Sequence, residues 1–276
     1  MDFQFTDFSL AFYGIESGDA RMRSFHETMT SWLQVLGLDS VQIMIGRPGL
    51  GDVAGDLVSV SSALGRDGFI GVESVEIIVA PENQKGTATN YLVHATCSYG
   101  RYAVVSLRGS VASSAGDGLM ALAEGLVAAL RPSYAVSFLM ALSFDPMSYT
   151  MGFLPHLLIA FQAPEDEEGD DDDVAQDPDQ AQEQLVKWGE MAMPLELYKK
   201  GVLRDLYNWN FLNKAQRSAL VEGVPLELWI KADSSRGRIR PSSNDLSLWT
   251  LSSSRIDVIR PVLLRNKVIF DYREFP

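Results

Sequence analysis

A glycine-rich segment near residue 50 has residue types and spacing that could hold a dinucleotide cofactor. Gly49-Leu50-Gly51-Asp52-Val53-Ala54 fits the pattern GxGxxA, and Glu73 lies about twenty residues further on, where an acid would bind a ribose. However, Arg47-Pro48 separates the glycines from the preceding predicted strand, and a tight strand-to-helix phosphate turn does not allow that insertion. The residues after Glu73 also predict hairpins. We therefore expect a plain glycine-rich loop and no dinucleotide.

Residues that bind metals or act as nucleophiles are few and scattered. The three histidines are His26, His94 and His156, and no HExxH motif is present. His26 falls on the polar side of a predicted helix, and we interpret all three as surface or hydrogen-bonded core residues. No GxSxG sequence nominates a nucleophilic serine, and the single cysteine, Cys97, is expected to fill the core. We therefore expect no catalytic residue, no metal and no cofactor.

The negative charge of the chain is concentrated in one segment. The ten acidic residues between Glu165 and Asp179 have no basic residue among them, and they account for most of the net charge of −13. The segment 164–182 has no aromatic residue and cannot bury enough apolar surface to order itself. The sequence therefore predicts an acidic linker at 164–182 between a domain of residues 1–163 and a domain of residues 183–276.

The remaining charge and hydropathy exclude some partners and locations. Arg236, Arg238 and Arg240 would lie on one face of a strand, where we expect solvated or salt-bridged side chains and no nucleic-acid site. The N-terminus has no basic region before an apolar run, and the apolar stretches 119–130 and 135–144 are too short to span a membrane. The expected location is the cytoplasm, without membrane contact.

The first 163 residues alternate between strand and helix patterns. One helical face is formed by Met22, Phe25, Met29, Trp32, Leu33 and Leu36. Strands are predicted at 3–15, 41–45, 72–79, 90–99, 102–107 and 134–144, and helices at 19–36, 53–64 and 119–130. A two-residue connection at 100–101 predicts a tight hairpin. This order favours the α+β class, with a mixed or antiparallel sheet and flanking helices.

The last hundred residues predict a smaller α+β unit. Helices are predicted at 184–191, after Pro225, and at 254–264, where Pro261 should cause a kink or an early stop. Strands are predicted at 237–241, 246–251 and 268–272.

A group of aromatic residues in this unit is suited either to a core or to an interface. Tyr207, Trp209 and Phe211 alternate with asparagines, so an extended chain would place all three on one face. As core residues they would anchor the unit, and as interface residues they belong to the types that dominate binding energy. The core interpretation is the more favoured one. Arg204 and Asp205 are expected to form structural hydrogen bonds around this cluster.

The same unit resembles a known protein family. The residues that carry the resemblance are 201–212 (GVLRDLYNWNFL), 228–230 (LWI), 236–237 (RG), 246–249 (LSLW), 262–264 (VLL) and 268–270 (VIF). They are similar to the immunity protein 52 family of bacterial polymorphic toxin systems. Proteins of that family are paired with restriction-endonuclease-fold toxins that are delivered by type VI secretion.

This resemblance implies a stoichiometric inhibitor that neutralises a cognate nuclease toxin and protects the producing cell and its kin. A nuclease presents a positively charged groove, which carboxylates could fill by mimicking phosphate. The candidate toxin-binding residues are therefore Glu165, Asp166, Glu167, Glu168, Asp170, Asp171, Asp172 and Asp173, together with Tyr207 and Trp209. The acidic block could also be a solubilising linker. Alternative functions are a non-inhibitory chaperone or adaptor for a secreted effector, and an enzyme supported only by the glycine motif.

Overall fold

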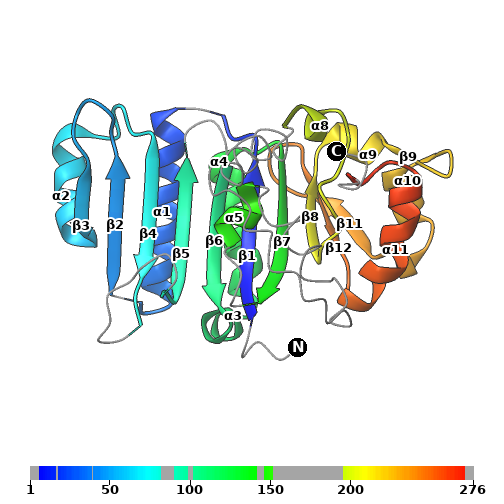
Figure 1. The fold of residues 1–276 in the computed structure, drawn as a ribbon, viewed down its shortest axis with the longest axis horizontal. Helices are drawn as coiled ribbons and strands as arrows, with labels where there is room; N and C mark the ends of the chain where they lie inside the picture. The colour runs from blue at the N-terminus through cyan, green and yellow to red at the C-terminus, as the bar shows by residue number, and fades with distance from the viewer. Residues whose placement is uncertain are drawn as a thin grey trace, which may run out of the picture.

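Ten of the described strands form one antiparallel sheet (Figure 1). The computed structural model describes residues 6–16, 18–38, 40–81, 90–98, 102–141, 146–151 and 195–270. In spatial order the strands of the sheet are β11 (Arg238–Pro241), β12 (Ser247–Thr250), β8 (Trp209–Leu212), β7 (Tyr134–Ala141), β1 (Thr6–Tyr13), β6 (Tyr102–Arg108), β5 (Val93–Ser98), β4 (Ser74–Val79), β2 (Val41–Gly46) and β3 (Val53–Asp56). Neighbouring strands all run antiparallel. The predicted α+β class with an antiparallel sheet and flanking helices is confirmed.

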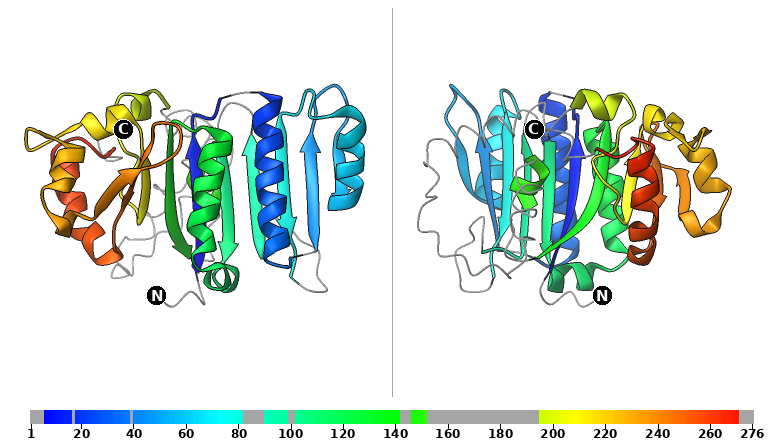
Figure 2. Two further views of the ribbon diagram at one scale, coloured as in Figure 1. Left: turned by 180° about the vertical axis from the view of Figure 1, so that it is seen from behind. Right: turned by 45° about the vertical axis from the view of Figure 1, so that its right-hand side comes forward.

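Two long helices cover one face of this sheet. α1 (Asp19–Val35) packs against α4 (Gly118–Leu130), and Figure 2 (left) shows both in front of the sheet, running roughly along its strands. Two shorter helices, α2 (Leu57–Asp67) and α3 (Gly109–Ala115), lie in the same N-terminal part of the chain. Side chains alternate along a strand, so Phe8, Leu10 and Phe12 of β1 enter the core beneath α1 and α4. We call this the helix-side core.

The C-terminal residues form a smaller α+β unit. Part of this unit packs on the opposite face of the sheet, and its strands extend the sheet at one edge. Its elements are α8 (Leu195–Lys199), α9 (Lys214–Ser218), β9 (Leu220–Val221), β10 (Val224–Pro225), α10 (Leu226–Lys231), the 3-10 helix η2 (Ser234–Arg236) and α11 (Ser253–Arg265). Ala11 and Tyr13 of β1, and Tyr134 and Phe138 of β7, join its apolar residues in a second cluster, the C-terminal core. The short helix α5 (Pro146–Met151) also contacts β1 and β6.

Strands from both sides of the predicted linker belong to the same sheet. β8 pairs directly with β7, with Phe211 opposite Ala135 and Trp209 opposite Ser137. Phe211 and Leu248 are fully buried in the helix-side core, so the C-terminal unit contributes to both cores. The segment 164–182 lies outside the described residues, and the division of the chain at that segment stays a prediction. The sheet nevertheless joins the flanking parts by strand pairing.

Three predicted elements differ from the structure. The predicted helix at 53–64 begins as strand β3, and the helix α2 starts at Leu57, after Asp56 accepts a hydrogen bond from the Ser59 N–H as its N-cap. The predicted strand at 268–272 is reduced, among its described residues, to one parallel bridge between Leu203 and Ile269. α11 runs through Pro261 to Arg265, so the early stop did not occur. The predicted helix at 184–191 lies outside the described residues.

The glycine-rich segment forms the turn of a β-hairpin. It connects β2 to β3, which pair antiparallel, with Ile45 opposite Val53. Gly49 and Gly51 have φ angles of +81° and +82°, a region that favours glycine, which explains both residues without a ligand. The strand-to-helix turn that a dinucleotide fingerprint needs is therefore replaced here by a strand-to-strand turn, in line with the expected plain loop.

His26 is buried, and its Nε2 has no hydrogen-bond partner among the described residues. Its predicted place on the polar side of a helix is therefore wrong, and so is its interpretation as a surface or hydrogen-bonded core residue. Its exposed fraction is 6%, and Phe69, which follows α2, packs against the imidazole at 5.6 Å between ring centroids. Burial lowers the pKa of His26, and the nearby Glu27 carboxylate opposes that shift only in part. The helical pattern of α1 alone could not show that the chain after α2 returns to cover this position.

Strand pairing across the linker predicts that the two parts stay together after cleavage. A site-specific protease sequence inserted between Val174 and Ala175 allows the chain to be cut there. We expect both fragments to co-elute as one particle in size-exclusion chromatography, because β7–β8 pairing and the shared core hold them. The same sample should separate in denaturing urea. Separate elution of the fragments in native buffer would refute a continuous sheet.

The lowered pKa of His26 predicts an acid-dependent loss of stability. The unfolded chain binds a proton at this histidine more tightly than the folded chain, so the stability present above the unfolded pKa of about 6.5 is lost as pH falls below it. Replacement of His26 by Leu removes this contribution. We expect denaturant titrations between pH 7 and pH 5 to give a shallower decline for His26→Leu. Parallel declines for the two proteins would show that His26 does not contribute.

Candidate functional site

The structure separates the two aromatic residues that the sequence nominated for partner binding. Trp209 is partly buried on the helix-side core, where Phe8 packs against it edge to face at 5.3 Å. Tyr207 is 7% exposed and belongs to the C-terminal core, with Phe138 at 6.0 Å between ring centroids. The eight candidate acids, Glu165, Asp166, Glu167, Glu168, Asp170, Asp171, Asp172 and Asp173, lie outside the described residues.

The Asn210 side chain accounts for this separation, because it forms hydrogen bonds with the backbone of Tyr207 and so makes a local turn before Trp209. The Asn210 side chain accepts a hydrogen bond from the Tyr207 N–H at 3.2 Å and donates one to the Tyr207 carbonyl oxygen at 2.6 Å. Such side-chain bonds replace strand pairing locally. β8 therefore begins only at Trp209, and the expectation that an extended chain places Tyr207, Trp209 and Phe211 on one face is wrong for Tyr207.

Tyr207 lines a cleft between β7, the residues before β8, and α11. This cleft has a volume of about 430 Å³. Its lining is apolar on β7, whereas α11 contributes Ile256 among polar residues. The lining residues are Phe138, Leu139, Met140, Tyr149, Asp205, Leu206, Tyr207, Asn208, Ser253, Ile256, Asp257 and Arg260. We call it the Tyr207 cleft. Tyrosine and arginine beside apolar side chains are the residue types that anchor protein partners.

Two polar pairs are formed by residues that line the Tyr207 cleft. The hydroxyl groups of Tyr149 and Tyr207 are hydrogen-bonded to each other. In the second pair, the Arg260 Nε donates to the Asp205 carboxylate at 2.8 Å. Burial raises the pKa of Asp205, while the Arg260 guanidinium and the Leu206 N–H, which both hydrogen-bond to its carboxylate, oppose that rise. In each pair, the hydrogen bond restricts the rotation of the two side chains that it joins.

Arg204 holds α5, and with it Tyr149, against the sheet. This side chain is fully buried, and one Nη donates to the Tyr13 hydroxyl and to the Thr150 carbonyl oxygen, each at 2.8 Å. The other Nη donates to the Tyr149 carbonyl oxygen, and the guanidinium lies 4.3 Å from the Tyr149 ring centroid. The predicted structural hydrogen bonding of Arg204 and Asp205 is confirmed. Burial raises the pKa of Tyr13, so this hydroxyl remains a neutral acceptor for Arg204.

Sequence reasoning missed two members of this site, Tyr149 and Arg260. Tyr149 lies about sixty positions before Tyr207 in the chain, in a short helix that no periodic pattern marks. Arg260 had a weak local signal, because Asp257 lies three positions earlier on the same helix and its carboxylate is within 3.9 Å. That spacing is common on exposed helices and does not indicate a cleft.

The other chemically suggestive residues have structural roles where they are described. His94 is buried and hydrogen-bonded to Glu76 at 2.8 Å, whereas His156 lies outside the described residues. Cys97 is buried in the core as expected, and burial raises the pKa of its thiol to about 12. Within the described ranges, no group of three or more His, Cys, Asp or Glu side chains could hold a metal ion. None of the helices described there is long and apolar enough to cross a membrane.

The three clustered arginines are distributed differently from the prediction. Arg236 lies in η2, not on the strand, and its guanidinium stacks 4.0 Å from the Trp229 ring centroid. Arg240 lies on β11 and pairs with Glu124 of α4 at 2.7 Å, while Arg238 is exposed. Arg240 is salt-bridged and Arg238 is solvated, as expected. The prediction that all three arginines lie on one face of a strand is wrong for Arg236.

Comparison with known proteins gives one informative result. No protein-family model matches this chain, and a search of curated proteins also finds no match. A solved structure of a Pseudomonas aeruginosa protein of the type VI secretion system is similar, with a TM-score of 0.54 and 10% sequence identity. The similarity covers 95% of this chain and 76% of that protein. At this identity the result establishes a shared fold, and the resemblance to the immunity protein 52 family stays a prediction.

The contacts of Arg204 predict a large loss of stability when its geometry is changed. Arg204→Lys keeps the charge, but a single ammonium cannot donate along both arms of the guanidinium. We expect the free energy of unfolding to fall by about 3 kcal/mol, because buried acceptors and a buried charge lose partners. Chemical denaturation monitored by tryptophan fluorescence measures this change. The matched exposed substitution Arg238→Lys should change stability by less than about 0.5 kcal/mol. Equal stabilities for both variants would contradict the role of Arg204.

Proposed function

We propose that this chain is an immunity protein that binds and neutralises a cognate secreted nuclease toxin in the cytoplasm of the producing cell. In this proposal it acts by forming a stoichiometric complex and not by catalysis. It needs no cofactor, and its partner is a restriction-endonuclease-fold toxin. The complex would protect the producing cell and its kin during competition between bacteria.

The observation that carries the proposal is the similarity to a type VI secretion protein over nearly the whole chain. It covers 95% of the residues, so it includes both the central sheet and the C-terminal unit. The sequence resemblance to the immunity protein 52 family falls on that same unit, at residues 201–270. The similarity of fold and the predicted resemblance to this family together favour a role in toxin delivery or toxin protection.

The Tyr207 cleft is the surface on which we place the partner. Protection against a toxin that kills at low copy number requires at least nanomolar affinity, or about −12 kcal/mol. An interface of about 1,600 Å² with a central anchor pocket commonly supplies such affinity. The cleft offers a preformed pocket whose tyrosine hydroxyls and Asp205–Arg260 pair are fixed before binding, which reduces the entropy lost in the complex.

The acidic block at 165–173 has a separate role in this proposal. Its eight carboxylates attract a basic nuclease groove over a distance and raise the association rate, whereas the cleft determines the dissociation rate. The two features therefore predict different signatures in binding kinetics, since steering by charge weakens with added salt and packing in a cleft does not.

A matched pair of substitutions on α11 tests the cleft directly. Ile256 lines the cleft, whereas Val258, which is 62% exposed, does not. Ile256→Arg places a charged side chain in the cleft, and Val258→Arg adds the same charge outside it. With the cognate toxin, we expect Ile256→Arg to raise the Kd at least tenfold through faster dissociation and to abolish protection on co-expression. Val258→Arg should change the Kd less than twofold.

The outcomes separate the proposal from its rivals. Thermal unfolding of both variants verifies that each is folded before its affinity is compared. Equal affinities for Ile256→Arg and Val258→Arg would place the partner elsewhere. Binding of the wild-type chain without protection would favour a chaperone or adaptor for a secreted effector. If the wild-type chain neither binds nor protects against a neighbouring toxin, the immunity function itself is wrong.

A further inference from the structure

The guanidinium that lines the Tyr207 cleft is directed at acceptors of the chain itself. The Arg260 Nε donates to the Asp205 carboxylate at 2.8 Å, and one Nη donates to the Leu206 carbonyl oxygen at 3.3 Å. The other Nη lies 3.9 Å from the Asp257 carboxylate, which is too long for a hydrogen bond. Arg260 is therefore held by Asp205 and Leu206, and it leaves the acceptors of Asp257 open.

Several acceptors of the cleft lining can take a further hydrogen bond. The Asn208 amide nitrogen donates to the Leu251 carbonyl oxygen at 3.0 Å and to the Ser253 Oγ at 3.2 Å. The Asn208 Oδ1 and the Asp257 carboxylate receive no hydrogen bond from the residues that the structure describes. Pro261 lies inside α11 and has no N–H, so the carbonyl oxygen of Asp257 also lacks its usual helical donor. The cleft thus offers acceptors to a ligand that carries several donors.

The charges at the cleft favour a cation over an anion. Asp205, Asp257 and Arg260 line the cleft and together carry −1. Arg204 lies against the Tyr149 ring at 4.3 Å, and it brings the sum of these four charges to zero. An incoming cation therefore meets no excess of positive charge. An incoming carboxylate would meet the Asp257 carboxylate, whose side chain is 84% exposed, and would be repelled.

The apolar part of the lining suits a basic side chain with a long aliphatic stem. Leu139 and Met140 of β7 line the cleft, and such surfaces pack the methylene groups of arginine and lysine while the charged head reaches polar groups. The open acceptors come from two segments, Asn208 before β8 and Asp257 on α11. A guanidinium has five N–H donors in a planar fork and can address both segments, whereas an ammonium is a compact point charge.

We propose that the Tyr207 cleft receives an arginine side chain of the nuclease toxin. The guanidinium donates to Asp257 and to the Asn208 Oδ1, and the aliphatic stem packs on Leu139 and Met140. This inference rests on the proposed toxin-neutralising function and names the residue type that the toxin places in the cleft. Arginine is well suited to binding phosphate, so an arginine held in the cleft would be withdrawn from nucleic acid.

The first test uses two small ligands and needs no toxin. N-acetyl-arginine amide carries the guanidinium, and N-acetyl-citrulline amide has nearly the same shape with an uncharged urea group. In NMR titrations of the full chain, the arginine amide should bind saturably with a millimolar Kd and shift the amide signals of residues 205–208 and 253–260. The citrulline amide should bind about tenfold more weakly, because a hydrogen bond to a charged group contributes about this factor.

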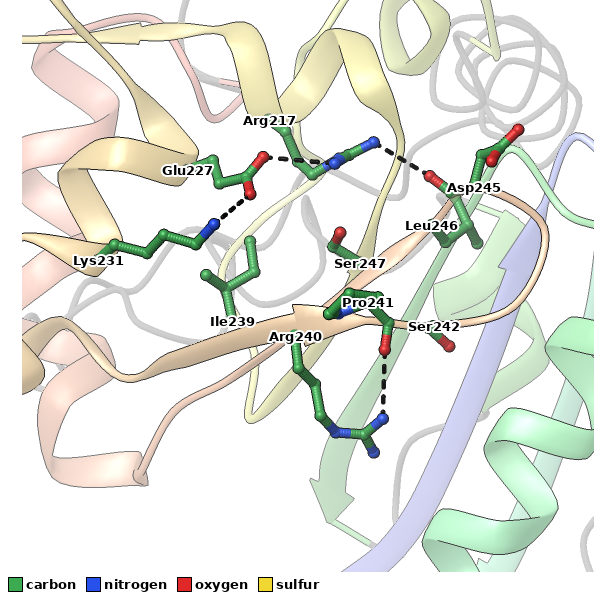
Figure 3. A pocket seen from close by; sticks show the side chains of 10 residues that line it. All are labelled: Arg217, Glu227, Lys231, Ile239, Arg240, Pro241, Ser242, Asp245, Leu246 and Ser247. Carbon is green, nitrogen blue, oxygen red and sulfur yellow. Dashed lines mark hydrogen bonds and ion pairs between the residues drawn. The ribbon is translucent and has the colours of Figure 1, made fainter.

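The second test removes one carboxylate without changing its size. Asp257→Asn should weaken binding of the arginine amide about tenfold and remove its advantage over the citrulline amide. Asp245→Asn is the matched control, because Asp245 is exposed in a different pocket of about 250 Å³, where Figure 3 shows it with Arg217, Glu227 and Lys231. Asparagine also tolerates the left-handed conformation of Asp245, whose φ is +61°. This control should change the Kd less than about twofold.

The same two variants are then compared in complex with the cognate toxin. Asp257→Asn should raise the Kd of the complex about tenfold, and Asp245→Asn should leave it nearly unchanged. Equal binding of the two amides, or equal losses for the two variants, would overturn recognition of arginine by the cleft. If the arginine amide binds as expected but the wild-type chain binds no toxin, toxin neutralisation is wrong and the arginine site remains.

Discussion

The buried guanidinium of Arg204 is the constraint on which the arrangement of the C-terminal core depends. A fully buried cation is costly unless its donors are satisfied, and Arg204 finds acceptors on Tyr13, Tyr149 and Thr150. These acceptors belong to the central strand β1 and to the short helix α5, whereas Arg204 itself precedes β8. The charge is therefore accommodated only when three distant parts of the chain meet on one face of the sheet.

Two features of the molecule are found around these contacts of Arg204. The C-terminal unit adds β8, β12 and β11 to the sheet and at the same time packs on the face opposite α1 and α4 (Figures 1 and 2). Tyr13, Tyr134 and Tyr198 pack on one another next to Arg204, with ring centroids 5.1 to 5.9 Å apart. The Tyr207 cleft adjoins this tyrosine-rich base, because the Tyr134 hydroxyl donates to the carbonyl oxygen of Asp205, which lines the cleft.

The sequence predicted the elements whose patterns are local and missed the features that need distant contacts. The apolar spacing in α1 and the alternation in β1 and β6 are local, and each element was found close to its observed bounds. The burial of His26 depends on Phe69 beyond the next helix, and the separation of Tyr207 from Trp209 depends on the side chain of Asn210. At the candidate site, Tyr207 was named for its residue type, whereas Tyr149 lies about sixty positions away in the sequence and contacts both Tyr207 and Arg204 only in the folded chain.

The central claim is that the Tyr207 cleft, held in place by Arg204, is the surface that receives a partner protein. Hydrogen–deuterium exchange of the chain, free and mixed with the proposed cognate toxin, measures this most directly. The account predicts slower exchange on binding at residues 205–208 and 253–260, with little change in β2 and β3 at the opposite end of the sheet. Slower exchange confined to β2 and β3, with none at the cleft, would contradict it.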